Sequence, residues 1–169
     1  MAVPVWAVGQ VLTADDINQW MVPFTAAKPA DTSRASTTTQ SADPDLVLAL
    51  AANAVYYITG VFNYNGTTQG TADFKFSFTA PAGSTVQWSA LYVNTSGAYA
   101  IMNPQNAGTG NNQIAGTTGT GNDRSLTMWA NVSTGGTAGN WTLFWAQGTS
   151  NVTATILRAN SLLVAQRIG

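Results

Sequence analysis

The sequence predicts an all-β fold, an antiparallel β-sandwich of the jelly-roll type with about eight to ten strands. Three observations support this. From residue 45 onward, apolar and polar residues alternate with a period of two, and turns rich in Gly, Asn and Pro interrupt the alternation at regular intervals. No segment in this part of the chain shows helical spacing, and the connections are too short for parallel crossovers.

The alternating segments are each short enough to be one strand. In one of them Phe74, Phe76 and Phe78 share a face, while Asp73 and Lys75 lie on the other, which is typical of a strand with one buried side. The predicted strands are 45–50, 55–64, 72–78, 85–93, 98–102, 112–115, 125–132, 140–147, 152–158 and 161–168.

The first 45 residues differ in composition, because they hold seven of the thirteen charged residues of the chain. We therefore divide the chain into an N-terminal anchoring arm, residues 1–44, and a sandwich domain for oligomerisation, residues 45–169. Residues 25–42 lack periodicity and predict an extended linker within the arm.

The arm also contains the signature of a short helix near residues 13–21. Thr13 suits the N-cap, Asp16 stands three residues later as in a capping box, and Leu12 and Ile17 have the spacing of a hydrophobic staple. A helix of two or three turns is marginal alone. Its apolar side chains are therefore expected to dock on another surface.

The composition excludes much catalytic chemistry. The chain has no His and no Cys, 8% charged residues, 45% apolar residues and a net charge of −1. Thiolate nucleophiles, Ser-His relays and common zinc sites are thus impossible, and six Lys and Arg form no basic patch for nucleic acid. We expect no enzyme, no cofactor or metal, no nucleic-acid or membrane partner, and synthesis in a cytoplasm, since no signal peptide or membrane span is evident.

Four weaker patterns have simpler explanations. Asp43 and Asp45 resemble part of a calcium site, but turn chemistry is favoured because no other acids cluster nearby. Asp123 is expected to form a weak ion pair with its neighbour Arg124. The N-glycosylation patterns match by chance in a chain so rich in Asn and Thr, and the strand tryptophans Trp88, Trp141 and Trp145 favour a core or an interface over a sugar platform.

Large apolar residues occupy both faces of several strands, and charged residues are scarce throughout the predicted sandwich. One face fills the interior, so the other is expected to be buried against further copies of the chain in a closed homo-oligomer. The alternative is a monomer with an uncharged but solvated Thr/Asn surface. The residues predicted for the oligomer interface are Tyr57, Val61, Trp129, Phe144 and Leu157.

Three stretches resemble virion proteins of tailed bacteriophages, particularly those of actinobacteria. The first is residues 9–18, GQVLTADDIN. The second joins KPADTSR at 28–34 to DPDL at 43–46 and AANAVY at 51–56. The third combines residues 139–147, GNWTLFWAQ, with 157–163, LRANSLL. The resemblance implies a structural virion component, a capsid decoration, minor tail or tail-fibre protein whose jelly-roll body trimerises.

Residues and resemblance together predict a homotrimeric capsid decoration protein on the virion surface, attached by its arm to the major capsid protein or to tail proteins. The expected attachment residues are Val5, Trp6, Leu12, Ile17, Trp20 and Met21. One alternative is a minor tail or tail-fibre protein that contacts its receptor, such as a host surface glycan, through the loops at 103–123. Another alternative is a free carbohydrate-binding module.

Overall fold

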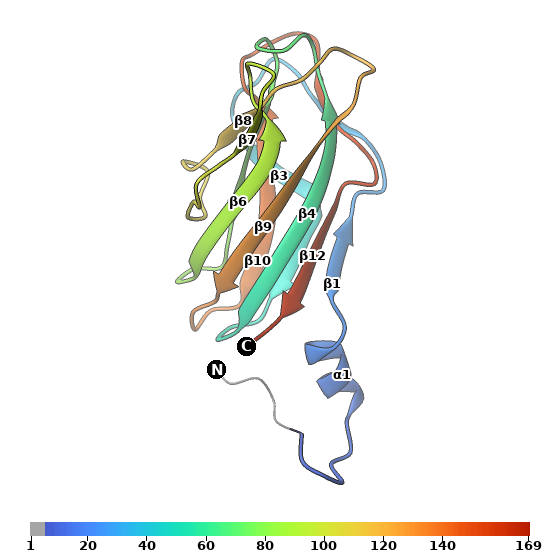
Figure 1. Ribbon diagram of the computed structural model, residues 1–169, viewed down its shortest axis with the longest axis vertical. Helices are drawn as coiled ribbons and strands as arrows, with labels where there is room; N and C mark the ends of the chain where they lie inside the picture. Colours follow the sequence, from blue (N-terminus) through green and yellow to red (C-terminus); the bar gives the residue numbers. More distant parts are fainter. Residues whose placement is uncertain (1–5) are drawn as a thin grey trace.

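Two antiparallel sheets pack face to face, and the core lies between them (Figure 1). This computed structural model describes residues 6–169. The predicted fold class is confirmed: within the described residues, strands dominate and a single short helix precedes them.

The larger sheet has eight strands and the smaller has four. The strands of the larger sheet are β1 (Phe24–Ala27), β2 (Thr32–Arg34), β4 (Val55–Asn65), β6 (Thr85–Val93), β7 (Tyr99–Ile101), β9 (Arg124–Ser133), β11 (Thr155–Leu157) and β12 (Leu162–Arg167). The strands of the smaller sheet are β3 (Ser41–Leu50), β5 (Phe74–Thr79), β8 (Gln113–Ala115) and β10 (Gly139–Gln147).

The eight strands from β3 through β10 pair in a nested order, like the two halves of one long hairpin that has rolled up. β6 pairs with β7, β5 with β8, β4 with β9, and β3 with β10. Rolling such a hairpin places alternate pairs in two facing sheets, and this is the jelly-roll arrangement. β12 and β1 then extend the larger sheet beyond β4, in the order β1-β12-β4-β9-β6-β7.

Aromatic side chains fill the space between the sheets. Phe74, Phe76 and Phe78 of β5 are 0% exposed, as their alternation predicts, and Phe78 stacks on Trp141 with 5.0 Å between the ring centroids. Trp88 meets Phe78 edge-on at 4.9 Å. The predicted core position of the strand tryptophans is therefore confirmed, and none of Trp88, Trp141 and Trp145 is available to a sugar.

Strands β1 and β2 lie where the sequence predicted an extended linker. β1 pairs with β12 at the edge of the larger sheet, and β2 pairs with β11. Both strands are short and consist mainly of Thr, Ser and Ala, so no alternation of apolar and polar residues predicts them. Of the described residues, those from 6 to 22 project from the sandwich (Figure 1). β1 and β2 belong to the sandwich, although they lie on the N-terminal side of the proposed division at residue 44.

The predicted helix and its cap are confirmed. α1 (Ala14–Trp20) begins after Thr13, whose hydroxyl accepts from the Asp16 amide, while the Asp16 carboxylate accepts from the Thr13 amide at 3.0 Å. The helix lies beyond the end of the sandwich at which β1 begins (Figure 1).

Candidate functional site

The outward face of the larger sheet is the first candidate site. Residues alternate between the two faces of each strand, and the register aligns those that point away from the core. One outward row crosses six strands, and neighbouring members are direct partners. This row is Ala27, Leu162, Val61, Thr127, Leu91 and Ile101.

No charged side chain belongs to this outward face in β1, β12, β4, β9, β6 and β7, all of which are described. We call it the uncharged face. Its members are Thr25, Ala27, Val55, Tyr57, Thr59, Val61, Asn63, Thr85, Gln87, Ser89, Leu91, Val93, Tyr99, Ile101, Ser125, Thr127, Trp129, Asn131, Ser133, Leu162, Val164 and Gln166. Solvated sheet faces of monomers normally carry charges, whereas interfaces are depleted of Lys, Glu and Asp.

Three residues predicted for the oligomer interface lie together on the uncharged face. Tyr57 is 43% exposed, and Val61 and Trp129 are half-buried. Tyr57 pairs with Asn131 and Val61 with Thr127, which places all three side chains around the centre of β4 and β9. The structure therefore gathers them, as the prediction of a shared surface requires.

The other two predicted interface residues are elsewhere. Phe144 is half-buried on the outer side of the smaller sheet, so it cannot join the same surface as Tyr57. Leu157 is 0% exposed and belongs to the core, which makes its assignment to a surface wrong. β11 has only three residues, so the sequence offered too little alternation to decide which of its side chains point inward.

The N-terminal segment is the second candidate site. Of the predicted attachment residues, Trp6, Leu12, Ile17 and Met21 are exposed, the last at 61%. Val5 lies outside the described residues. Three more large apolar residues of this segment are exposed and were not among those predicted, namely Val8, Val11 and Val22. We call residues 6–22 the projecting segment.

Trp20 has a different environment from the other predicted attachment residues. Its ring lies against the Arg167 guanidinium, with 4.3 Å from Cζ to the ring centroid, and its carbonyl accepts from Gln166 Nε2 at 2.8 Å. The ring is half-buried. Trp20 thus ties the end of α1 to β12 of its own chain, and it orients the projecting segment.

Charged side chains gather in two clusters away from both surfaces. Lys28 lies between Asp43 and Asp45, with Nζ–O distances of 3.0 and 2.8 Å to the nearest oxygen of each. Asp43 and Asp45 therefore both form ion pairs with the Lys28 ammonium group, which was not predicted from the sequence. No group of three or more His, Cys, Asp and Glu side chains in residues 6–169 could hold a metal ion.

The second cluster joins Arg158 to Asp31 at 2.7 Å and to Asp123 at 2.9 Å. The predicted pair of Asp123 with Arg124 is wrong, because Arg124 donates instead to the Gly116 carbonyl at 3.3 Å. The Asp31 carboxylate and the Arg158 guanidinium stabilise each other's charged forms. Hydrogen bonds from the Ala159 amide and from Arg158 lower the pKa of Asp31. Hydrogen bonds to Asp123 and Asp31 raise the pKa of Arg158.

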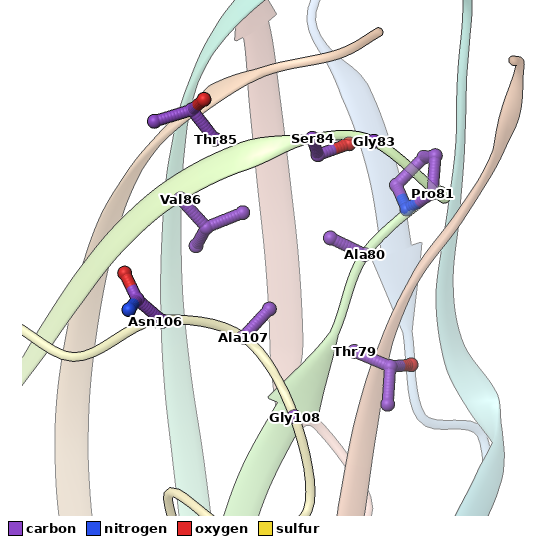
Figure 2. Close-up of a pocket in the computed structure, with 10 residues that line it drawn as sticks. All are labelled: Thr79, Ala80, Pro81, Gly83, Ser84, Thr85, Val86, Asn106, Ala107 and Gly108. Carbon is purple, nitrogen blue, oxygen red and sulfur yellow. The ribbon is translucent and has the colours of Figure 1, made fainter.

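A pocket of about 560 Å³ opens between the β5–β6 turn and the loop that contains residues 106–108 (Figure 2). Ala80, Val86 and Ala107 point into it, and its polar residues are Ser, Thr and Asn. No acid, base or cation lines this pocket. It therefore lacks the groups that general acid–base catalysis requires.

No helix among the described residues is both long and apolar enough to cross a membrane. No protein-family model matches the chain, and no curated protein matches it in sequence.

Among solved structures, the chain is distantly similar to one from the tripod of the baseplate of bacteriophage Tuc2009. The identity is 10% and the TM-score 0.39, over 98% of this chain and 75% of that one. It is also similar to a chain of infectious bursal disease virus strain Gx, at 14% identity and a TM-score of 0.27, over 88% of this chain and 36% of the other. A subviral particle of that virus gives 12% identity and a TM-score of 0.23, over 88% and 37%.

Proposed function

We propose that this protein is a non-enzymatic structural component of a tailed-phage virion, a homotrimer that decorates the capsid through its N-terminal segment. The observation that carries the proposal is the presence of two unpartnered surfaces on one chain, the uncharged face and the projecting segment. One surface serves contact between copies, and the other serves attachment to the shell.

The uncharged face suits a second copy of the same chain. Where copies of this face meet around a three-fold axis, no charge is buried unpaired and no like charges meet. Strand spacing and rise give this face a projected area of roughly 600 Å² across six strands, which a trimer shares between two neighbours. Exposed aromatic residues such as Tyr57 are typical of interfaces between proteins.

The projecting segment suits attachment to a lattice of other proteins. Trp6, Leu12, Ile17 and Met21 lose water contact only if another surface covers them, and their burial would offset the ordering of the segment. A trimer presents three such segments, so weak individual sites add up through avidity. The likeness of residues 9–18 to the opening of tailed-phage virion proteins supports the shell as that surface.

Sedimentation equilibrium tests the contact between copies. The wild-type chain is expected to sediment as a trimer at micromolar concentration. Leu91→Lys places a cation on the uncharged face and should yield monomer, because the buried ammonium would lack a partner. The control is Ala49→Lys, at an exposed site on β3 of the other sheet, which should remain trimeric. A wild-type monomer would contradict the proposal.

Deletion of residues 2–22 tests the attachment. Because β1 begins at Phe24, the shortened chain keeps both sheets and should form the same oligomer. It should fail to join particles assembled with the full virion protein set. Val152→Asp, at an exposed loop position far from the segment, is the control and should be incorporated as the wild type is. Incorporation of the deleted chain would exclude attachment through this segment.

A minor tail or tail-fibre protein is the second candidate, favoured by the loops rich in Gly and Asn around β8, within residues 103–123. Such loops suit contact with a receptor, for which a host surface glycan is one possibility. Electron microscopy of particles labelled on this chain distinguishes the two locations. Many copies over the head support decoration, whereas label confined to the tail supports the second candidate.

A further inference from the structure

Lys28 is the most deeply buried cation in the described part of the chain. Its side chain is 0% exposed, and so is that of Asp43. Nζ donates to both carboxylate oxygens of Asp43, at 3.1 Å to Oδ1 and 3.0 Å to Oδ2. The folded chain therefore holds the amine and the carboxyl group in direct contact, and such positioning lowers the entropic cost of bringing two reacting groups together.

The surroundings of Asp43 resemble an oxyanion-stabilising site. Oδ1 accepts from two backbone amides, those of Asp45 at 3.1 Å and Leu46 at 3.2 Å. Oδ2 accepts from the indole Nε1 of Trp145 at 3.1 Å. Donors placed in this way around a buried carboxyl group stabilise negative charge that develops on its oxygen.

A second carboxylate stands beside the ammonium group. Asp45 Oδ2 lies 2.8 Å from Lys28 Nζ, and its side chain is 30% exposed. The Arg34 guanidinium also interacts electrostatically with Asp43, so two cations and two carboxylates gather here. Burial of charged groups is costly even when they are paired. Conversion of the Lys28–Asp43 pair into a neutral amide would remove two buried charges at once.

We propose that Lys28 Nζ and Asp43 Cγ form an intramolecular isopeptide bond. Asp45 relays one proton from the ammonium group to Oδ2 of Asp43, and the neutral amine then attacks Cγ of the resulting carboxylic acid while the amides of Asp45 and Leu46 stabilise the charge that develops on Oδ1. Oδ2 then leaves as water with two protons that came from the nitrogen, passed on by Asp45. One C–N bond forms and one C–O bond breaks, and no oxidant or other reactant is needed. Asp45 ends as the carboxylate it was at the start.

This bond would fasten the end of β1 to the start of β3. Lys28 follows β1 directly, its amide donates to the Ser161 carbonyl at 2.8 Å, and Asp43 lies within β3. The short edge strand β1 would then be held covalently to the sandwich at its C-terminal end, whereas the projecting segment leaves from its N-terminal end. The inference is independent of the proposed function, since it concerns chemistry within one chain.

Mass spectrometry of the intact, unfolded wild-type chain tests the bond. Its mass should be lower than the sequence mass by one water molecule. Trypsin does not cleave between Lys28 and Pro29, so the digest should contain peptides 1–34 and 35–75 joined, with the same loss. An undiminished mass with separate peptides overturns the proposal. So does a water loss confined to peptide 35–75, which would mark a cyclic imide at an aspartate.

Variants identify the groups involved. Lys75→Arg alters the other lysine of the chain, which lies on the outer side of β5, and should retain the loss of water. Lys28→Arg should have the full mass. Asp45→Asn keeps the Lys28–Asp43 pair but removes the proton acceptor, so most molecules should have the full mass. If every Asp45→Asn molecule loses a water molecule, Asp45 is not the proton acceptor. The existence of the bond is decided separately, by the mass of the wild-type chain.

Discussion

Arg34 shows how a single side chain fixes a junction between elements. Its guanidinium lies over the Trp145 ring at 4.1 Å and donates to the carbonyls of Ser41, at 2.8 Å, Ala42, at 2.8 Å, and Trp145. Burial lowers the pKa of Arg34, although a guanidinium remains charged at neutral pH. The side chain thereby joins β2 to the neighbouring ends of β3 and β10, near the place where their register shifts.

The change Arg34→Lys should destabilise the protein. Lysine keeps the charge but cannot present a planar fork to several carbonyls while stacking on an indole. We expect the free energy of unfolding to fall by about 1.5–3 kcal/mol, the range for hydrogen bonds to charged groups. Urea denaturation measures it. Arg124→Lys is the matched control, because Arg124 makes one bond to Gly116 and should lose much less; equal losses would contradict this account.

At the residue scale, the sequence predicts contacts that follow from a local pattern but not those between residues far apart in the chain. It identified the inward positions of Phe74, Phe76 and Phe78, because alternation is local. It could not pair Lys28 with Asp43, or Arg158 with Asp31, because only the folded sheets bring these charges together. The partners of buried charges depend on tertiary structure, and no local pattern encodes them.

At the scale of elements, α1 is held by its two ends. Its N-terminus has the capping box of Thr13 and Asp16, and its C-terminal Trp20 packs on Arg167 of β12. Between these points Ile17 remains exposed. A helix of seven residues is too short to persist on propensity alone, so cap and anchor together keep its apolar residues presented to solvent.

The capping box predicts an acid-sensitive helix. Hydrogen bonds from the Thr13 hydroxyl and amide lower the pKa of Asp16 below its ordinary value of 3.8. Because the pKa is lower in the folded state, the contribution of the cap is present above the unfolded value and is lost as the pH falls through the folded value. An NMR titration should find Asp16 below 3.8, and Thr13→Ala should raise its pKa.

The matched control for this titration is Thr13→Ser, which keeps the hydroxyl donor and should leave the pKa of Asp16 low. A wild-type Asp16 that titrates at 3.8 or above would show that the cap does not form in solution.

The strands illustrate what an element-scale pattern can and cannot predict. Long strands with one buried side, such as β6 and β9, were predicted to within one residue at each end. β1 was missed because an edge strand of four residues has almost no periodicity, and its pairing depends on the Leu162–Ala165 segment far along the chain. Jelly-roll topology follows from the nesting of hairpins, which the order of strands alone leaves open.

At the scale of the whole molecule, strand β12 connects the uncharged face to the projecting segment. β12 contributes Leu162 and Val164 to the uncharged face, and the same strand anchors α1 through Arg167. Contact between copies on this face would therefore fix the direction in which each projecting segment leaves the sandwich. In the proposed assembly, one strand would thereby couple contact between copies to attachment.

The stability of the whole sandwich should decline in alkali. Tyr64 of β4 is 0% exposed, stacks on Phe74 at 4.8 Å and donates to the Gly116 carbonyl at 3.2 Å. Burial raises the pKa of its phenol well above the ordinary value of 10.0. Because the folded pKa is the higher one, this stabilisation is complete below pH 10 and is lost as the pH rises from there toward the folded value.

Urea denaturation at a series of pH values measures this loss. Above pH 10 the free energy of unfolding should fall with an added slope approaching about 1.4 kcal/mol per pH unit from this one group. Tyr64→Phe should cost about 1 kcal/mol at neutral pH through the lost hydrogen bond, and yet it should flatten the alkaline decline. An unchanged slope in Tyr64→Phe would show that ionisation of this buried tyrosine does not drive alkaline unfolding.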